Sequence, residues 1–254
     1  MPPQPQKSNN GAVIAIVAAV VVFVVLVGVV AVVFLANRGG GDPAPVATGS
    51  ASPSPSKSPS PSPSPSRLDP SVLDSEETDP IDFDRDVFFP DSSFRGDNDV
   101  KYTLAGSTKT DACDGIGSGK AKEIIKRHGC RDMLVAVWLD EDERIFSGIM
   151  VIPYETDDDA DDVLDEIQDS RQAVIDSLYY YCPADGYPGA DLCDRSSDNL
   201  PTWYASFTTF HRYLFVMVSL YVDGHRNEDV SEIDEFTSET VNYVSQVLLE
   251  ELED

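Results

Sequence analysis

The stretch Met133–Ile152, MLVAVWLDEDERIFSGIMVI, decides how the folded part of the chain is interpreted. Two apolar runs, 133–139 and 144–152, flank the charged segment Asp140–Glu143. Short apolar runs that are rich in valine and isoleucine and bounded by a polar turn are typical of buried strands. This stretch therefore predicts a β-hairpin.

Helix and strand patterns continue on both sides of this hairpin. The basic stretch 120–128 has its apolar residues on one face and predicts a short helix, and Thr156 can cap a longer helix that reaches Leu178. Alternation over 202–210 and 213–222 predicts a second pair of strands, and Ser231 opens a last helix. The expected order is helix, two strands, helix, two strands, helix. We therefore expect an α+β fold, with one antiparallel four-stranded sheet and helices packed on one face.

The four cysteines fall into two local pairs along this part of the chain. Four cysteines allow three pairings, and the local one joins Cys113 to Cys130 and Cys182 to Cys193. Neither a C-x-x-C nor an H-x3-H spacing, which would favour a metal site, occurs in the sequence. We expect two structural disulfides, which are typical of an oxidising compartment, and no cofactor or metal.

An uncharged apolar stretch, Gly11–Ala36, precedes all of these elements. As a helix it would be roughly 39 Å long, and the hydrocarbon core of a bilayer needs ~30 Å. The alternative is a cleaved signal peptide, but cleavage after Ala36 would place Phe34 where a small residue is required. We expect a transmembrane helix at 11–36, which contacts the lipid bilayer.

The orientation of this helix follows from three features of the chain. The amino-terminal tail 1–10 is short, the cysteines suit an oxidising compartment, and Ser52–Ser66 alternates proline and serine almost throughout, as extended spacers do. We therefore expect a single-pass plasma-membrane protein with a cytoplasmic tail at 1–10 and the carboxy-terminal part outside. Residues 37–97 are expected to be a disordered linker, first Pro/Ser-rich and then acidic, and 98–254 an extracytoplasmic α+β domain.

The end of that linker mixes aspartates with apolar residues, including Phe88 and Phe89. Such a segment can bind a partner, or it can pack as an arm on the domain that follows it. Two adjacent exposed phenylalanines would form a costly surface patch, which favours the arm.

The formal net charge of −27 narrows the set of partners. Nucleic acid is disfavoured, because phosphate binding is driven by Lys and Arg. The acidity itself is explained by solubility outside the cell more simply than by recognition of a cationic partner. The expected partner is another envelope protein or a component of the cell wall.

One short motif points to a different function. Gly115–Ile125, GIGSGKAKEII, resembles the second half of a helix-hairpin-helix DNA-binding element, in which a Gly-apolar-Gly turn leads into a helix that holds a phosphate. This resemblance implies an extracellular DNA receptor acting through the Gly115–Gly119 turn. The alternative is an ordinary helix preceded by flexible glycines, because residues 105–111 lack the apolar periodicity of a first helix and the second copy of the element is missing.

The sequence contains no catalytic signature. There is no G-x-S-x-G motif, and the three histidines have no spacing typical of a triad or a metal site. The acidic clusters do not follow the EF-hand order either. We therefore expect a protein that is not an enzyme. A wall-associated hydrolase that uses paired carboxylates remains the alternative, since many acids are present.

Aromatic residues are the remaining candidates for a binding surface. If helices cover one face of the sheet, part of the aromatic set lies on the other face or in the loop after Cys182, where Tyr and Trp bind ligands well. The expected surface comprises Tyr180, Tyr181, Tyr187, Trp203 and Tyr204. With its Val/Ala-rich anchor, Pro/Ser-rich spacer and small disulfide-containing exterior part, the chain resembles uncharacterised single-pass membrane proteins of actinobacteria. That resemblance implies a membrane-tethered binding or assembly domain in the cell envelope.

Overall fold

The computed structural model describes residues 68–97, 99–194, 203–225 and 230–253. The tail 1–10, the expected transmembrane helix 11–36 and the Pro/Ser-rich part of the linker lie outside these residues. Within the described ranges, no helix has both the length and the apolar character needed to cross a membrane.

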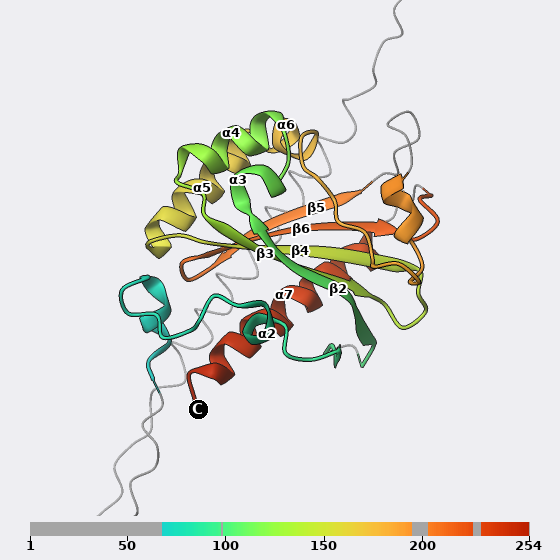
Figure 1. The fold of residues 1–254 in the computed structure, drawn as a ribbon, viewed down its shortest axis with the longest axis horizontal. Helices are drawn as coiled ribbons and strands as arrows, with labels where there is room; N and C mark the ends of the chain where they lie inside the picture. Colours follow the sequence, from blue (N-terminus) through green and yellow to red (C-terminus); the bar gives the residue numbers. More distant parts are fainter. Residues whose placement is uncertain (1–67, 98, 195–202, 226–229, 254) are drawn as a thin grey trace, which may run out of the picture. The chain divides into compact units, whose positions relative to one another are not determined.

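The described residues form an α+β fold around one antiparallel sheet (Figure 1). The sheet has six strands in the order β1-β2-β3-β4-β6-β5. The strands are β1 (Ser93–Arg95), β2 (Lys101–Asp111), β3 (Asp132–Leu139), β4 (Ile145–Pro153), β5 (Tyr204–Phe210) and β6 (Tyr213–Tyr221). The helices are η1 (Pro70–Asp74), α2 (Arg85–Phe88), α3 (Ala112–Gly115), α4 (Gly119–Arg127), α5 (Asp157–Asp169), α6 (Arg171–Ile175), η2 (Ala190–Asp194) and α7 (Ser231–Glu251).

Both expected strand pairs are confirmed. In the β3–β4 hairpin, Leu139 pairs with Phe146, and in the β5–β6 hairpin, Phe210 pairs with Tyr213. β4 and β6 join the two hairpins at the centre of the sheet, with Ile145 opposite Tyr221 at one end and Pro153 opposite Tyr213 at the other.

The expected number of four strands is wrong, because β1 and β2 extend the sheet beyond β3. β2 contains the polar run Ser107–Asp111, which does not alternate apolar and polar residues. β2 lies towards the edge of the sheet, so many of its side chains face solvent and its polar residues avoid the cost of desolvation. β1 is only three residues long and holds its place by pairing with Lys101–Thr103.

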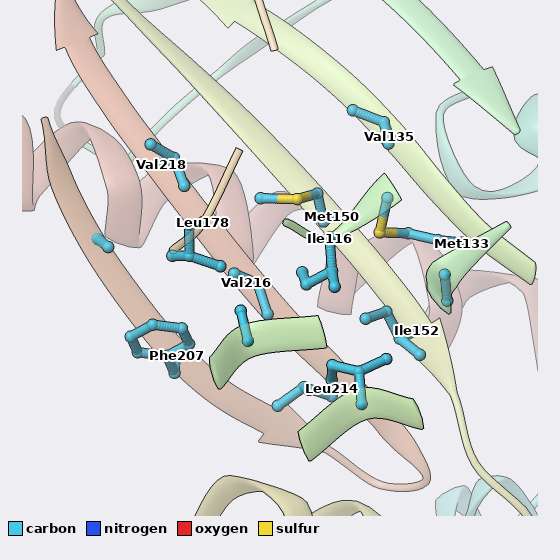
Figure 2. Packing of buried hydrophobic residues seen from close by; sticks show 14 of the residues in the cluster. Ile116, Met133, Val135, Met150, Ile152, Leu178, Phe207, Leu214, Val216 and Val218 are labelled. Atoms are coloured by element: carbon cyan, nitrogen blue, oxygen red, sulfur yellow. The ribbon is translucent and has the colours of Figure 1, made fainter. Parts of the chain in front are cut away.

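The expectation that helices cover one face is also wrong, since helices cover both. Every residue of β4 and β6 is buried, so both of their faces need a cover. On one face α3, α4, α5 and α6 pack over the sheet, and Figure 2 shows the apolar core between them, with Ile116 and Leu178 directed at the strands. On the other face lies α7, together with the segment that precedes β1.

That segment, residues 68–92, is termed the arm. Leu73, Phe88 and Phe89 of the arm are buried, and they join Tyr213, Phe215 and α7 in the second core. The folded part therefore begins well before the expected boundary at residue 98. Phe88 and Phe89 therefore belong to an arm that packs on the folded part, and not to a free partner-binding segment.

The arm is fixed to one end of the sheet by a buried ion pair. The Arg212 guanidinium lies 2.7 Å from the carboxylate of Asp79 and donates to the Tyr154 carbonyl at 2.8 Å. The side chain of Asp79 is 0% exposed. We call this end, where Pro153 pairs with Tyr213, the arm end, and the opposite end, where Ile145 pairs with Tyr221, the distal end.

The helix after β4 begins as expected. The Thr156 side chain accepts a hydrogen bond from the backbone N–H of Asp159, and the Asp159 carboxylate accepts one from the backbone N–H of Thr156, which completes a capping box. The expected single helix up to Leu178 is instead divided at Ser170 into α5 and α6.

Candidate functional site

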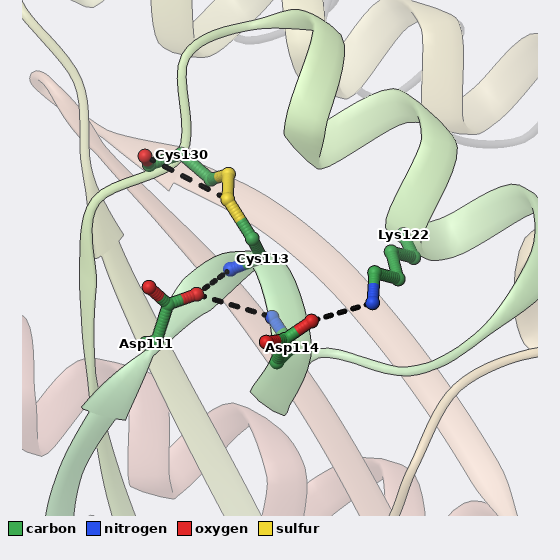
Figure 3. The surroundings of a disulfide bond; sticks show 5 residues. All are labelled: Asp111, Cys113, Asp114, Lys122 and Cys130. Atoms are coloured by element: carbon green, nitrogen blue, oxygen red, sulfur yellow. Dashed lines mark hydrogen bonds and ion pairs between the residues drawn. A yellow bond between two sulfur atoms is a disulfide. The ribbon is translucent and has the colours of Figure 1, made fainter.

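The two disulfides form with the expected local pairing. Cys113 is bonded to Cys130 and Cys182 to Cys193, and no free cysteine remains among the described residues. Figure 3 shows the first disulfide beside the start of α3, where the Asp111 carboxylate accepts from the backbone N–H groups of Cys113 and Asp114. Asp114 in turn forms an ion pair with Lys122 of α4. The disulfide thus closes the two-helix excursion between β2 and β3.

The aromatic residues expected to form one binding surface are divided between the two faces of the sheet. Tyr180, Tyr181 and Trp203 pack at the margin of the core under α4 and α5, whereas Tyr204 packs on the α7 side. The hydroxyls of Tyr180 and Tyr181 donate to backbone carbonyls. Only Tyr187 of the five is exposed, at 39%. These five residues therefore do not form a single surface.

Tyr204 is held to α7 by a hydrogen bond of 2.6 Å from its hydroxyl to the Asp234 carboxylate. Burial, and then this carboxylate, raise the pKa of Tyr204 to about 12. The hydroxyl therefore stays protonated near neutral pH and acts as a structural donor.

The Gly115–Gly119 turn uses its hydrogen-bonding groups within the chain. Ser177, which follows α6, accepts from the Ala121 N–H through its hydroxyl at 2.9 Å and from the Ser118 N–H through its carbonyl at 2.7 Å. A Cβ atom on Gly117 would lie 2.3 Å from that same carbonyl. The glycine thus permits close approach of the Ser177 backbone, and the start of α4 is capped by the chain itself. This geometry favours the interpretation as an ordinary helix.

Side chains of both charge signs meet at the distal end of the sheet. The β3–β4 turn brings three acidic residues beside the start of α7 and the start of β2, where they line a cavity of about 310 Å³. We call this cavity the acidic pocket. Its lining is Val100, Tyr102, Asp140, Glu141, Asp142, Arg144, Ile145, Glu232, Glu235 and Phe236.

The hairpin turn positions this lining through Asp140. One oxygen of its carboxylate accepts from the N–H groups of Arg144 at 2.6 Å and Ile145 at 2.8 Å, which closes the turn. Asp140 is 9% exposed, and burial is the largest cause of the rise in its pKa. This carboxylate therefore holds the turn in place.

Arg144 is the one cation in the lining of the acidic pocket. It forms an ion pair with Glu232 of α7, and its Nε lies 3.5 Å from the Asp142 carboxylate. The Glu232 carboxylate raises the pKa of Arg144, which stays charged. Five carboxyl groups thus share the lining with one guanidinium, and the pocket keeps an excess of negative charge.

Aromatic rings lie beneath these charges. Tyr102 of β2 and Phe236 of α7 are stacked, with ring centroids 4.7 Å apart and an angle of 11° between their planes. A second cavity of about 310 Å³ adjoins the first, shares Arg144 and Glu232 with it, and is also lined by Tyr221, Asp223 and His225. The distal end therefore offers carboxylates at its rim above a buried aromatic floor, and this excess of negative charge suits a cationic group.

In the part of the chain that the structure describes, no three His, Cys, Asp or Glu side chains are grouped as metal ligands.

The sequence indicated a turn at Asp140–Glu143, but it gave no sign that α7 and β2 would bring Glu232, Glu235 and Tyr102 to the same place. The ion pair between Arg144 and Glu232, for example, joins residues 88 positions apart.

Comparisons of the chain with protein-family models, with curated proteins and with solved structures find no match. The function is therefore argued from the chemistry of the distal end.

Proposed function

We propose that the chain is a membrane-tethered binding protein of the cell envelope, and that the acidic pocket at the distal end binds a cationic group of its ligand. The observation that carries this proposal is the pocket itself, in which five carboxyl groups and one guanidinium surround the stacked rings of Tyr102 and Phe236. Carboxylates attract an ammonium or guanidinium group, while the rings of Tyr102 and Phe236, which are 2% and 3% exposed, form a buried apolar floor beneath them.

The place of the pocket relative to the arm supports this proposal. The arm, through which a tether would reach the folded part, is fixed beside Tyr213 at the arm end, and the acidic pocket is lined by Ile145, which pairs with Tyr221 at the distal end. Nine paired residues of β4 separate the two ends, which at ~3.3 Å per step amounts to roughly 26 Å. The pocket thus lies at the end of the sheet opposite the Asp79–Arg212 ion pair that fixes the arm.

The membrane attachment is part of the same proposal. It rests on the uncharged apolar stretch Gly11–Ala36 for the anchor and on two disulfides for the exterior location. In this proposal residues 1–10 are cytoplasmic, the folded part is outside, and the ligand belongs to another envelope protein or a wall component that carries amines or guanidinium groups.

Titration of the full chain with a tetralysine peptide tests the pocket. The double variant Glu141→Gln/Asp142→Asn removes two exposed carboxylates of the lining and leaves the Asp140 turn and the Arg144–Glu232 pair in place. We expect the dissociation constant to rise about 5- to 30-fold at low salt, since each of the two lost charge contacts is worth roughly 0.5–1 kcal/mol. Calorimetry measures this change.

The matched control is Asp158→Asn/Asp162→Asn, which makes the same change in net charge on the exposed side of α5. It should leave the affinity nearly unchanged. An equal loss of affinity in both double variants would mean that the peptide binds through the overall acidity of the chain, and the proposal would be wrong. It would also be wrong if tetralysine did not bind at all.

A further inference from the structure

The sheet has one edge that is bound by side chains and another that is partly open. At the edge formed by β5, the Arg171 guanidinium donates to the Ala205 carbonyl at 3.1 Å and stacks over the Phe207 ring. The Thr209 hydroxyl donates to Asp161 of α5 at 2.7 Å. Charged side chains thus cover this edge and oppose pairing with another strand.

The other edge is completed only in part. β1 pairs with Lys101–Thr103 at the start of β2, and farther along the Ala184 N–H donates to the Ala105 carbonyl at 2.7 Å. Both contacts are made by extended backbone against the outer side of β2. From Ser107 onwards, no strand of the described residues continues this cover.

The ladder with β3 shows which backbone groups face outwards. Ala112 donates to the Arg131 carbonyl at 2.7 Å, which continues the β2–β3 pairing by one residue. Because the groups that face a neighbouring strand alternate along the chain, Ala112, Thr110 and Thr108 face β3. The N–H and C=O groups of Ser107 and Lys109 therefore face away from the sheet.

These outward groups have almost no partner among the described residues. The one contact made to them is a long hydrogen bond of 3.4 Å from the Thr108 hydroxyl to the Lys109 carbonyl. The Lys109 ammonium does not cover the edge as Arg171 does. It forms an ion pair with Asp132 at 2.9 Å and donates to the Phe83 carbonyl of the arm at 3.1 Å.

A cavity of about 190 Å³ lies directly beside this open edge. Val135 and Val137 of β3 lie behind it, and Tyr181 and Ala184 flank it. Gly106 leaves it open, since a Cβ atom there would meet only Ala184, at 3.6 Å. The cavity is large enough for one apolar side chain.

We propose that an extended segment of a partner protein adds to the outer edge of β2 as a further strand, pairing with Ser107 and Lys109 and placing one apolar side chain in the cavity between Val137 and Tyr181. Main-chain hydrogen bonds supply the affinity and the cavity supplies selectivity. The net charge of −27 favours a neutral or basic segment and opposes a second copy of this chain. This surface is independent of the acidic pocket.

Hydrogen exchange of the full chain in detergent micelles tests the open edge. In the free protein, the amides of Ser107 and Lys109 should exchange quickly and those of Thr108 and Thr110 slowly. Slow exchange at Ser107 and Lys109 would mean that the edge is already paired, and the proposal would fail.

A phage-displayed library of eight-residue peptides, selected on the same full chain, tests the partner. A selected peptide should slow exchange at Ser107 and Lys109 and leave the β5 edge unchanged. N-methylation of alternate peptide residues in one register should abolish binding, and methylation in the other register should not, because only one set of N–H groups faces β2. Ala184→Trp, at an exposed position, should fill the cavity and weaken binding about tenfold.

Selection of no peptide, equal effects of the two methylation registers, or protection at the β5 edge would overturn the proposal. Sedimentation of the full chain provides a further check, because dimers abolished by Ala184→Trp would show that a second copy, and not a partner peptide, occupies this edge.

Discussion

At the scale of single residues, Asp140 links the hairpin turn to the acidic pocket. Its carboxylate accepts the N–H groups of Arg144 and Ile145, and the turn it closes carries Glu141 and Asp142 at the pocket rim. A turn at these positions is predicted by the sequence, because four charged residues separate two apolar runs. The burial of Asp140 could not be predicted, since it depends on contacts made by the completed sheet.

Substitution of Asp140 separates its hydrogen bonds from its charge. Asp140→Asn keeps an oxygen that can accept both N–H groups, so we expect a change of less than ~1 kcal/mol in the free energy of unfolding near neutral pH. Asp140→Ala leaves both donors without a partner, one of them buried, and should cost about 1–3 kcal/mol. Urea unfolding measures both, and equal losses would contradict the role of Asp140 as a turn acceptor.

The pH dependence of this effect has a definite sign. Burial raises the pKa of Asp140 in the folded state, so the folded chain binds the proton more tightly than the unfolded chain does. The stability from Asp140 is therefore full below its unfolded pKa and is lost as the pH rises through the folded one. Unfolding measured from about pH 3 to 7 should show a smaller fall for Asp140→Asn than for the wild type.

At the scale of elements, the amino acid pattern predicts a helix or strand best where that element is buried on a regular face. The two hairpins, α4 and α7 all follow from apolar runs or helical spacing. β2 could not be predicted in this way, because its polar half, Ser107–Asp111, is held in the sheet by pairing with β3 and not by burial of an apolar face. β4 and β6 nevertheless carry apolar residues on both of their faces, and that signal could have predicted helices on both sides.

The arm is the element with the sharpest energetic test. Asp79→Ala removes one partner of a fully buried ion pair and leaves the Arg212 guanidinium uncompensated, which should cost about 3–5 kcal/mol. Glu76 also lies in the arm, where it is the half-exposed partner of Arg131. Glu76→Ala should therefore lower the free energy of unfolding by less than ~1 kcal/mol. Thermal unfolding compares the two.

A further variant distinguishes the charge from the packing. Asp79→Leu/Arg212→Met replaces both partners with apolar side chains and should recover most of the lost stability. If Asp79→Ala proved as mild as Glu76→Ala, the arm would not be clamped at the arm end.

At the scale of the whole molecule, the sequence predicted the fold class and the pairing of the cysteines, and missed the site. The disulfides were predictable because each pair is close in the chain, 17 and 11 positions apart. The acidic pocket was not, because it joins the starts of β2 and α7 to the β3–β4 turn. The expected aromatic surface was divided because neighbours such as Trp203 and Tyr204 face opposite sides of a strand.

We propose that the folded part lies outside the membrane, attached through an anchor at 11–36, with both disulfides formed. The most direct measurement is labelling of intact cells that produce the full chain with a membrane-impermeant maleimide, before and after mild reduction. We predict no labelling before reduction, and labelling of Cys113, Cys130, Cys182 and Cys193 on intact cells after it. Labelling that appears only after lysis, and without any reduction, would contradict the claim.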